Sequence, residues 1–430
     1  MLRAFSAFLM IAHLDADSFF ASVLLRKHPQ LRGKPLLAVG MGGGCVIAAT
    51  YEAKAKGVKT GMRLKEARML APNAVEMPAD FRETSIASAQ IESILKDLCP
   101  LVEQMSIDEW FLDLSSLVGG SPNYLRQWAK EVRERILQAT DLSMSVGVAP
   151  SKLLAKMASE YRKPGGITIV DLPSSLGPPE RTGSVRAGGE VGGGSMNIEE
   201  FLKDRPAAAI PGIGKQRSTK TDAAGIVTAW DFAQRTDEIL TSMCGKQGRE
   251  MKRELLGDML FPVRANANPP KSISRCRTFR ATIDTDLLKA HLLKHLEYCT
   301  MKMRRQGLVC REISIHLRTA DYVYAGMHHR FERPCSTAEQ MMPAALMLLA
   351  DMTKNRAQRN QIGLALLGLV PIGMIQQSIF EDLADIVADE RLQAALDDIQ
   401  TRFGRDSVTR ATALSVKSGT VKGLDFSIID

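Results

Sequence analysis

The stretch that decides the fold is FLMIAHLDADSFFA, residues 8–21. Residues 8–14 are apolar except for one histidine, which is typical of a buried strand. The strand is expected to stop at Asp15, and a helix is expected from Ser18 to Arg26. Asp15 and Asp17 should therefore lie at the point where a buried strand passes into a helix.

The segments on either side of this stretch alternate between strands and helices. Residues 101–106 and 110–114 suggest a hairpin, and the pattern over the first ~170 residues indicates an α+β domain. The Gly-rich segment 173–195 has no periodicity and is expected to be a flexible linker. The other expected strands are 45–49 and 143–148, and the other expected helices are 51–56, 83–97, 125–138 and 152–161. Residues 198–260 are expected to be helical, and 266–270 to be a second linker. A β-like run is expected to begin at Lys271. It is followed by expected strands over 311–318 and 361–369 and expected helices over 287–305 and 337–351.

Composition narrows the class of protein. The chain has 430 residues, 45% hydrophobic and 24% charged, which argues against wholesale disorder and a collagen-like repeat. No stretch approaches the ~20 apolar residues of a transmembrane helix, so no membrane association is expected. Seven cysteines without a CxxC pair indicate a reduced, cytoplasmic protein without a zinc framework.

The first twelve residues superficially resemble a secretory signal, with Arg3 before an apolar run. They lead into His13 without a turn or a small-residue cleavage pattern, so a buried first strand is favoured. The residues ahead of Met10 are alternatively a start-site extension.

Charge is distributed unevenly. The formal net charge is +8 and the pI about 9.1; residues 245–333 carry 18 Lys and Arg against 9 Asp and Glu, and residues 371–430 carry 6 against 10. A basic middle and an acidic end indicate a body that binds a polyanion, most simply nucleic acid, followed by a tail with another role. On charge alone, a merely solvated basic surface is the alternative.

Two pairs of carboxylates suggest a metal site. Asp15 and Asp17 end the first strand, and Asp108 and Glu109 lie at the junction of the expected hairpin. Carboxylates brought together in this way hold two divalent ions ~3.5–4 Å apart, and hard oxygen ligands favour Mg²⁺. Taken alone, Asp-X-Asp occurs widely by chance, and a surface turn is then the default interpretation.

The neighbouring residues favour a nucleotide. Phe20 follows the first acidic pair, and Tyr51 and Lys54 share one helical face at spacing i, i+3. Lys152, Lys156 and Lys163 add positive charge. Metal ligands, cations and a planar aromatic ring together fit a triphosphate and its sugar.

A second motif, residues 210–215 (IPGIGK), is followed by Ala224-Gly225-Ile226. A Pro-Gly-Ile-Gly hairpin between two helices directs backbone N–H groups outward, where they bind a phosphate without reading base sequence. A plain structural turn is the alternative.

In this order, the motifs resemble those of Y-family DNA polymerases, and the DinB/polymerase IV branch most closely. The resemblance spans roughly residues 8–370. It is carried by LDADSFFA (14–21), ATYEAK (49–54), SIDE (106–109), SVGVA (145–149), LAKMAS (154–159), KPGGI (163–167), the hairpin, and KSIS (271–274).

The resemblance implies a right-hand polymerase in which Asp15, Asp108 and Glu109 are the catalytic metal ligands for two Mg²⁺ ions. The backbone carbonyl of Ala16 would assist them, and Phe20 would be the steric gate against a 2′-hydroxyl. Asp17 is expected to be structural. Further roles implied by the family are triphosphate binding by Tyr51, Lys54 and Lys163, and DNA phosphate binding by Gly212, Gly214, Lys215, Lys271 and Ser272.

The same resemblance implies four domains and a tail. The palm would comprise residues 1–21 and 81–172, the fingers 22–80, the helical thumb 197–262 and the α+β little finger 271–370. Residues 173–196 and 263–270 would link them, and 371–430 would form the tail.

Three features of the chain depart from the family pattern. The Gly-rich segment 173–195 looks like an insertion between the palm and the thumb. The residues after the hairpin, 216–222, are unusually polar, and Trp110 replaces a smaller residue after the acidic pair. None of these departures removes a catalytic group, but the polar helix leaves open how the thumb binds duplex DNA.

The tail contains QQSIF, residues 376–380, which resembles the sliding-clamp-binding pentapeptide of bacterial polymerases. Gln376, Ile379 and Phe380 are the expected anchors, and an amphipathic turn is the alternative.

The sequence therefore predicts a monomeric, translesion-type DNA polymerase that adds dNTPs to a primer–template by two-metal-ion phosphoryl transfer and does not proofread. The alternatives are a catalytically silent family member that scaffolds repair proteins, and a palm-type nucleotide cyclase. A silent relative should lack one of the three catalytic carboxylates, and a cyclase would not need the hairpin or the basic region.

Overall fold

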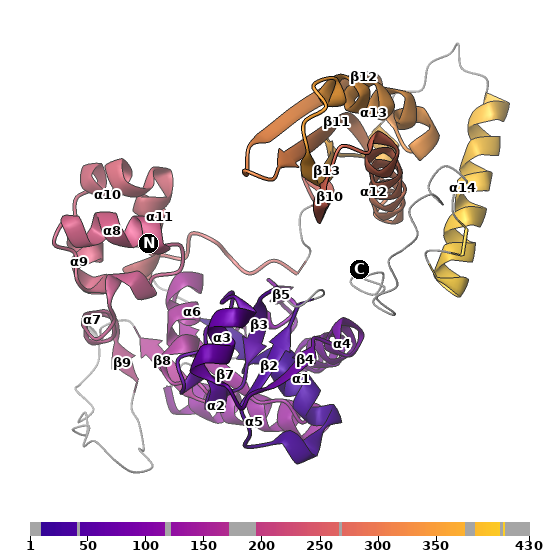
Figure 1. Cartoon of the computed structure of the whole chain (residues 1–430). Helices are drawn as coiled ribbons and strands as arrows, with labels where there is room; N and C mark the ends of the chain where they lie inside the picture. The colour runs from indigo at the N-terminus through magenta and orange to yellow at the C-terminus, as the bar shows by residue number, and fades with distance from the viewer. Residues whose placement is uncertain are drawn as a thin grey trace, which may run out of the picture. The chain divides into compact units, whose positions relative to one another are not determined.

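The computed structural model describes residues 10–40, 44–116, 122–171, 195–265, 269–374, 383–404 and 407–408. The chain divides between residues 267 and 268 into two compact units (Figure 1). None of the helices in these described ranges is long and apolar enough to cross a membrane.

Unit 1 is built on a mixed sheet. Within the described residues, six strands pair in the order β5 (Val102–Gln104), β6 (Glu109–Asp113), β1 (Ile11–Ala16), β7 (Met144–Ala149), β8 (Ile167–Asp171) and β9 (Met196–Asn197). Strand β1 is fully buried and pairs antiparallel with both β6 and β7. The buried first strand expected from the sequence is thus confirmed. It does not stop at Asp15: it continues through Ala16, because β7 still pairs with it at that residue.

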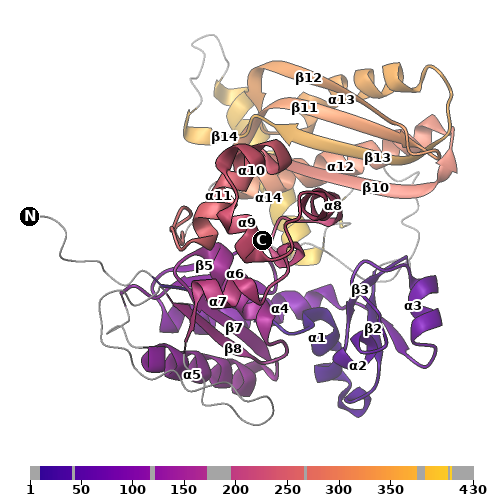
Figure 2. The same cartoon turned by 90° about the vertical axis from the view of Figure 1, so that its left-hand side faces the viewer.

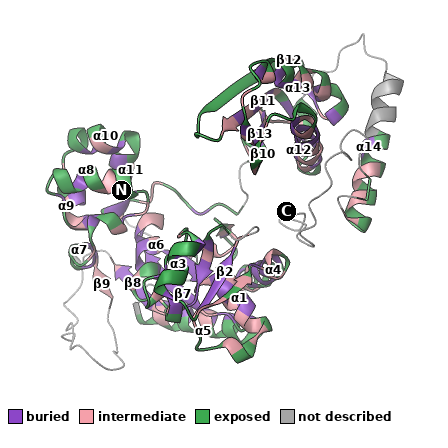
Figure 3. Cartoon of the chain, viewed as in Figure 1, coloured by how far each residue is buried: buried purple, intermediate pink, exposed green. Residues whose placement is uncertain are grey.

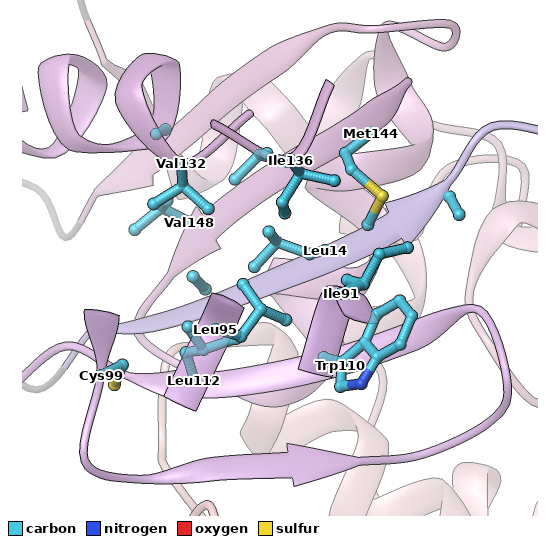
Figure 4. Close-up of a cluster of buried hydrophobic side chains, with 14 of the residues drawn as sticks. Leu14, Ile91, Leu95, Cys99, Trp110, Leu112, Val132, Ile136, Met144 and Val148 are labelled. Atoms are coloured by element: carbon cyan, nitrogen blue, oxygen red, sulfur yellow. The ribbon is translucent and has the colours of Figure 1, made fainter. Parts of the chain in front are cut away.

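One face of this sheet is covered by α4 (Phe81–Leu98) and α5 (Pro122–Thr140). Asp80 caps α4 by accepting the Glu83 N–H at 3.1 Å, and Ile91 and Leu95 follow at helical spacing on its buried face. Figure 4 shows the resulting core. The departing residue Trp110 is fully buried there, so it serves as a core side chain.

The opposite face carries α6 (Lys152–Tyr161), which packs on β7 and β1. Gly147 makes this close approach possible: a Cβ at this position would lie 2.1 Å from the Ala155 carbonyl oxygen. A strand residue without a side chain therefore brings the α6 backbone directly onto the sheet.

A smaller sheet follows α1 (Phe19–Lys27) and η1 (Pro29–Leu31). It pairs β3 (Val46–Ala49), β2 (Leu36–Val39) and β4 (Val75–Pro78), with α2 (Tyr51–Lys54) and α3 (Leu64–Leu70) inserted along the chain. Figure 2 shows α1 between the two sheets, where it contacts β2, β3 and α4. Strands β2 and β4 were not predicted.

The rest of unit 1 is helical, as the sequence predicted. Its core is continuous with residues of α6, and Phe201 and Phe232 are among its fully buried side chains. The elements are α7 (Ile198–Lys203), η2 (Ala207–Ala209), α8 (Lys215–Ala223), α9 (Ala229–Gln234), α10 (Asp237–Cys244) and α11 (Lys246–Leu255). The expected 173–195 linker falls almost wholly outside the described residues.

Unit 2 is an antiparallel sheet with helices on one face. Its strands pair in the order β10 (Ser272–Thr282), β13 (Arg359–Leu367), β11 (Leu308–Thr319) and β12 (Tyr324–Cys335), and β14 (Val370–Pro371) pairs with β11. Helices α12 (Thr285–Arg305) and α13 (Ala338–Thr353) bury alternate residues of these strands. The chain continues through η3 (Ile372–Met374) to α14 (Leu383–Phe403).

The β10, β11 and β13 strands and both helices match the sequence prediction, whereas β12 was not predicted. Strand β12 is almost wholly exposed at a sheet edge (Figure 3). Its sequence therefore lacks the apolar alternation that marks a half-buried strand.

Candidate active site

The three predicted catalytic carboxylates lie on neighbouring segments of the main sheet of unit 1. Asp15 on β1 is directly opposite Glu109 on β6. Asp108 lies in the turn before β6, where its carbonyl oxygen accepts the Ala16 N–H at 2.9 Å. The hairpin junction and the end of the first strand therefore meet as the sequence predicted.

Two lysines neutralise two of these carboxylates. Lys163 Nζ lies 2.5 Å from Asp15 Oδ1, and Lys156 Nζ lies 2.7 Å from both carboxylate oxygens of Glu109. Burial raises the pKa of Asp15 to about 6, and the positive charge of Lys163 opposes this shift. Asp15 is thus a desolvated carboxylate that requires a cation beside it.

The donor chemistry fits a hard divalent cation. Asp15, Asp108 and Glu109 supply oxygen ligands, which Mg²⁺ prefers, and two of them already attract the cationic ends of lysines. Across the described ranges, no group of three or more His, Cys, Asp or Glu side chains is gathered closely enough to form a preassembled metal cluster.

Asp17 has the structural role expected for it. Its carboxylate accepts hydrogen bonds from Ser143 Oγ and Ser145 Oγ, both at 2.7 Å, and from the Gly165 N–H at 2.8 Å. These contacts join the end of β1 to β7 and to the segment before β8. Asp17 thereby fixes the strand end that presents Asp15.

The predicted triphosphate ligands lie beside this strand end. The Tyr51 hydroxyl donates to Asp17 Oδ1 at 3.3 Å, and Lys54 Nζ donates to Ser18 Oγ at 2.7 Å while lying 4.3 Å from the centre of the Tyr51 ring. Burial, followed by the charge of Lys163, lowers the pKa of Lys54. Tyr51, Lys54 and Lys163 are thus gathered around the end of β1.

Phe20, the predicted steric gate, is the second residue of α1, the helix that follows Asp15 and Asp17. Its neighbour Phe19 is 2% exposed and belongs to the core of the main sheet, whereas Phe20 is only partly buried. The Phe20 ring packs edge-on against Phe81, with 5.4 Å between centroids. Phe19 and Phe81 therefore limit the movement of the Phe20 ring beside the carboxylates.

Sequence reasoning missed two partners of Glu109. The sequence pattern marks Lys156 only as added positive charge. It does not mark His13, although His13 lies two residues before Asp15 and so on the same side of β1. His13 Nε2 lies 4.0 Å from Glu109 Oε2. The period-two spacing in the strand was the available signal.

The predicted phosphate hairpin has the expected exposed backbone. Ile213 is buried, and Gly212 and Gly214 on either side of it are exposed. Gly212 has φ +98°, and a Cβ there would lie 2.4 Å from Met251 Cε, so glycine is required. Gly214 precedes α8, whose first residue Lys215 is exposed. The element before the hairpin is the 3₁₀ turn η2 and not the α-helix that a helix-hairpin-helix would have.

The polar composition of residues 216–222 is explained by exposure. Thr221 is the buried residue of α8. In unit 2, Lys271 and Ser272 are exposed at the start of β10. The clamp-motif residues Gln376, Ile379 and Phe380 lie outside the described residues.

Family models and proteins of known name match most of this chain in sequence. The family model described as the impB/mucB/samB family matches residues 14–160, and the model of its C-terminal domain matches residues 270–379. DNA polymerase IV of Xanthomonas euvesicatoria is 31% identical over 374 residues, which is 86% of this chain and 97% of that protein. DNA polymerase IV of Pelotomaculum thermopropionicum is 30% identical over 413 residues, 93% and 94% of the two chains.

This chain belongs to the Y-family, in its DinB/polymerase IV branch. Solved structures of Y-family polymerases share the fold of this chain. A Y-family DNA polymerase chimera superposes with a TM-score of 0.70 at 24% identity, covering 84% of this chain and 99% of the other. DinB from Sulfolobus solfataricus gives a TM-score of 0.56 over the same shares. The resemblance inferred from the motifs, and the right-hand fold it implied, are confirmed.

Proposed function

We infer that this chain is a template-directed DNA polymerase of the translesion type, which adds dNTPs to a primer 3′ end without proofreading. The observation that carries this inference is the register pairing of Asp15 with Glu109, with Asp108 in the adjoining turn. The relatives of similar length are named DNA polymerase IV. A silent scaffold would have no need to retain all three carboxylates.

We propose that Asp15, Asp108, Glu109 and the carbonyl of Ala16 hold two Mg²⁺ ions. When bound, such ions activate the attacking hydroxyl and neutralise charge on the phosphates in an in-line displacement. The protein residues supply position. Asp17 fixes the strand end through its serine contacts, and the buried environment of Asp15 strengthens its attraction for cations.

Tyr51, Lys54 and Lys163 are positioned to hold the triphosphate of the incoming dNTP. Lys163 is paired with Asp15, so an arriving phosphate would share this ammonium with the carboxylate. Phe20 is proposed to occupy the space that a ribose 2′-hydroxyl needs. Binding a nucleotide between fixed cations and a fixed ring is catalysis by positioning and charge neutralisation.

We assign residues 1–21 and 81–172 to the palm, 22–80 to the fingers, 197–262 to the thumb and 271–370 to the little finger. Primer–template DNA is proposed to be held through its phosphates. The exposed groups that fit this role are the backbone of Gly212 and Gly214, the side chain of Lys215, and Lys271 with Ser272. The protein is proposed to act as a cytoplasmic monomer whose residues 376–380 bind the replication sliding clamp.

Primer extension on undamaged and lesion-bearing templates tests the proposed activity. Wild-type protein with Mg²⁺ and dNTPs should extend both templates. Asp108→Ala should abolish incorporation while leaving primer–template binding largely intact, because it removes a metal ligand and no core contact. Asp97→Ala, at an exposed position on α4, is the matched control and should extend as wild type does. Extension by Asp108→Ala within about tenfold of wild type, a change of about 1.4 kcal/mol in the barrier, would refute the assignment.

A further inference from the structure

A buried histidine connects the metal-ligand strand to α6. His13 is fully buried on β1, and its Nδ1 lies 2.7 Å from Ser159 Oγ. The contact depends on Gly147, which is the strand neighbour of His13 on β7. A Cβ at Gly147 would lie 2.3 Å from the Ser159 backbone nitrogen. Without a side chain at residue 147, α6 descends far enough for Ser159 to reach the imidazole.

We assign the tautomer of His13 from its hydrogen-bond partners, since the position of a ring proton is inferred from the network around it. Ser159 Oγ donates its single proton to the Lys156 carbonyl oxygen at 2.8 Å. The hydroxyl must then accept from His13, so Nδ1 is protonated and Nε2 carries a lone pair. This Nε2 is a buried acceptor with no hydrogen-bond partner within the described residues.

The unpartnered nitrogen faces the Glu109–Lys156 ion pair. Oε2 of Glu109 lies 4.0 Å from His13 Nε2 and 2.7 Å from Lys156 Nζ. An imidazole lone pair and a carboxylate oxygen do not attract each other, so Glu109 is not the partner of Nε2. Among the contacts described, the only donor at this carboxylate is the Lys156 ammonium. Lys156 is therefore the natural partner of Nε2. A buried acceptor without a donor is unfavourable, and a change in the position of Lys156 would satisfy it.

We propose that His13 is a positioning residue of the metal site, and that its Nε2 accepts the Lys156 ammonium when a divalent cation takes Glu109. This inference rests on the proposed function. Lys156 blocks both oxygens of Glu109 in the metal-free protein, so a cation must displace it. An acceptor beside the pair lowers the cost of that displacement. His13 thereby favours metal binding without touching the metal.

Two substitutions separate this role from a purely structural one. The Asn side chain ends near the position of Nδ1, so His13→Asn keeps a polar group toward Ser159 and removes the Nε2 acceptor. The Gln side chain reaches the position of Nε2, so His13→Gln keeps an acceptor toward Lys156 and loses the Ser159 contact. Outer partners of metal ligands commonly affect metal affinity by 10–100-fold.

The Mg²⁺ concentration for half-maximal dNTP insertion is the first measurement. It should rise about tenfold in His13→Asn and stay within about twofold of wild type in His13→Gln. Thermal unfolding of both variants measures how much stability each substitution removes. If His13 had only a structural role, a lower unfolding temperature would be the main effect of both substitutions. An unchanged Mg²⁺ requirement in His13→Asn, or an equal rise in both variants, would overturn the proposal.

Nitrogen NMR of the wild-type chain provides a second measurement that needs no turnover. With ¹⁵N-labelled histidine and no DNA, the Nε2 resonance of His13 should be that of an unprotonated nitrogen. It should move upfield as Mg²⁺ alone is added, because the nitrogen then accepts a hydrogen bond. A resonance that Mg²⁺ leaves in place would overturn the proposal. Because primer extension by the wild type tests the polymerase function separately, the failure of one is distinguishable from the failure of the other.

Discussion

The ammonium of Lys163 lies 2.5 Å from Oδ1 of Asp15, so a lysine between α6 and β8 neutralises a carboxylate on the central strand β1. The charge of Lys54 also acts on this region, since Lys163 is among the causes that lower the pKa of Lys54. Lys54 and Lys163 thus present two ammonium groups close together, beside the buried carboxylates of Asp15 and Asp17. Such a site attracts the anionic phosphates of a nucleotide.

Lys163→Met should therefore weaken nucleotide binding. A hydrogen bond between a charged donor and a phosphate contributes about 1.5–3 kcal/mol, so the KM for dNTP should rise about tenfold or more. Steady-state single-nucleotide insertion measures this, and primer–template affinity should not change. Lys130→Met, at an exposed position on α5, is the control. An unchanged KM would show that Lys163 serves only Asp15.

Phe20→Ala should admit ribonucleotides. The ring is held against Phe81, so its removal opens space that the neighbouring core does not fill. We expect the ratio of dNTP to rNTP insertion efficiency to fall by at least about tenfold, or about 1.4 kcal/mol. Phe20→Tyr keeps the bulk of the ring and should keep the discrimination. If the alanine variant retains the wild-type ratio, the gate lies elsewhere.

The sequence placed Asp15, Asp108 and Glu109 together because a strand end and a hairpin junction are local patterns, and one sheet pairing joins them. The contacts of Glu109 with Lys156 and His13 could not be predicted in this way. They depend on how closely α6 approaches β7, and that distance is set by Gly147 through tertiary packing. Strand β12 was missed because exposure removes the apolar alternation on which strand prediction depends.

The acidic tail provides a test that leaves the active site intact. Replacing Gln376, Ile379 and Phe380 together by Ala should spare distributive synthesis on a short primer–template. It should remove stimulation by the loaded sliding clamp, because apolar and aromatic anchors dominate binding at such interfaces. Product length with and without loaded clamp is the measurement. Equal stimulation of the triple variant and the wild type would mean that the pentapeptide is a chance match.

Unit 2 should lose stability in mild acid. Burial lowers the pKa of His295 to about 3 and that of His291 to about 4, below the ordinary value of 6.5. The unfolded chain therefore binds protons below pH 6.5 that the folded unit does not, and stability falls as the pH drops from 6.5 toward the folded pKa values. For His295 the loss at pH 5 is about 2 kcal/mol relative to neutral pH.

Thermal unfolding of the full chain at pH 7 and pH 5 measures this effect. His295→Leu should reduce the loss between the two pH values, because an apolar side chain has no proton to bind. His328→Leu changes an exposed histidine and should leave the loss as it is in the wild type. The same pH dependence in His295→Leu as in the wild type would place the acid sensitivity in groups other than His295.

The contact between β7 and α6 can be tested at Gly147. In Gly147→Ala the new Cβ would lie 2.1 Å from the Ala155 carbonyl oxygen and 2.3 Å from the Ser159 nitrogen. Both are helix backbone atoms, so the whole of α6 must move, and overpacking of this kind costs about 1–3 kcal/mol or more. Moving α6 also displaces Lys156 and Ser159 from Glu109 and His13. Because Lys156 then no longer blocks the oxygens of Glu109, single-nucleotide insertion assays should show a lowered Mg²⁺ requirement in the protein that remains folded, in addition to a lower unfolding temperature.

Gly44→Ala is the matched control in the same unit, because a Cβ at this position meets nothing within 4 Å. It should change neither the unfolding temperature nor the Mg²⁺ requirement. If Gly147→Ala lowers the unfolding temperature but leaves the Mg²⁺ requirement unchanged, then the height of α6 above the sheet matters for folding alone. A lowered requirement in the folded protein links the absence of one side chain on β7 to the position of Lys156, and through it to the carboxylate that Lys156 occupies.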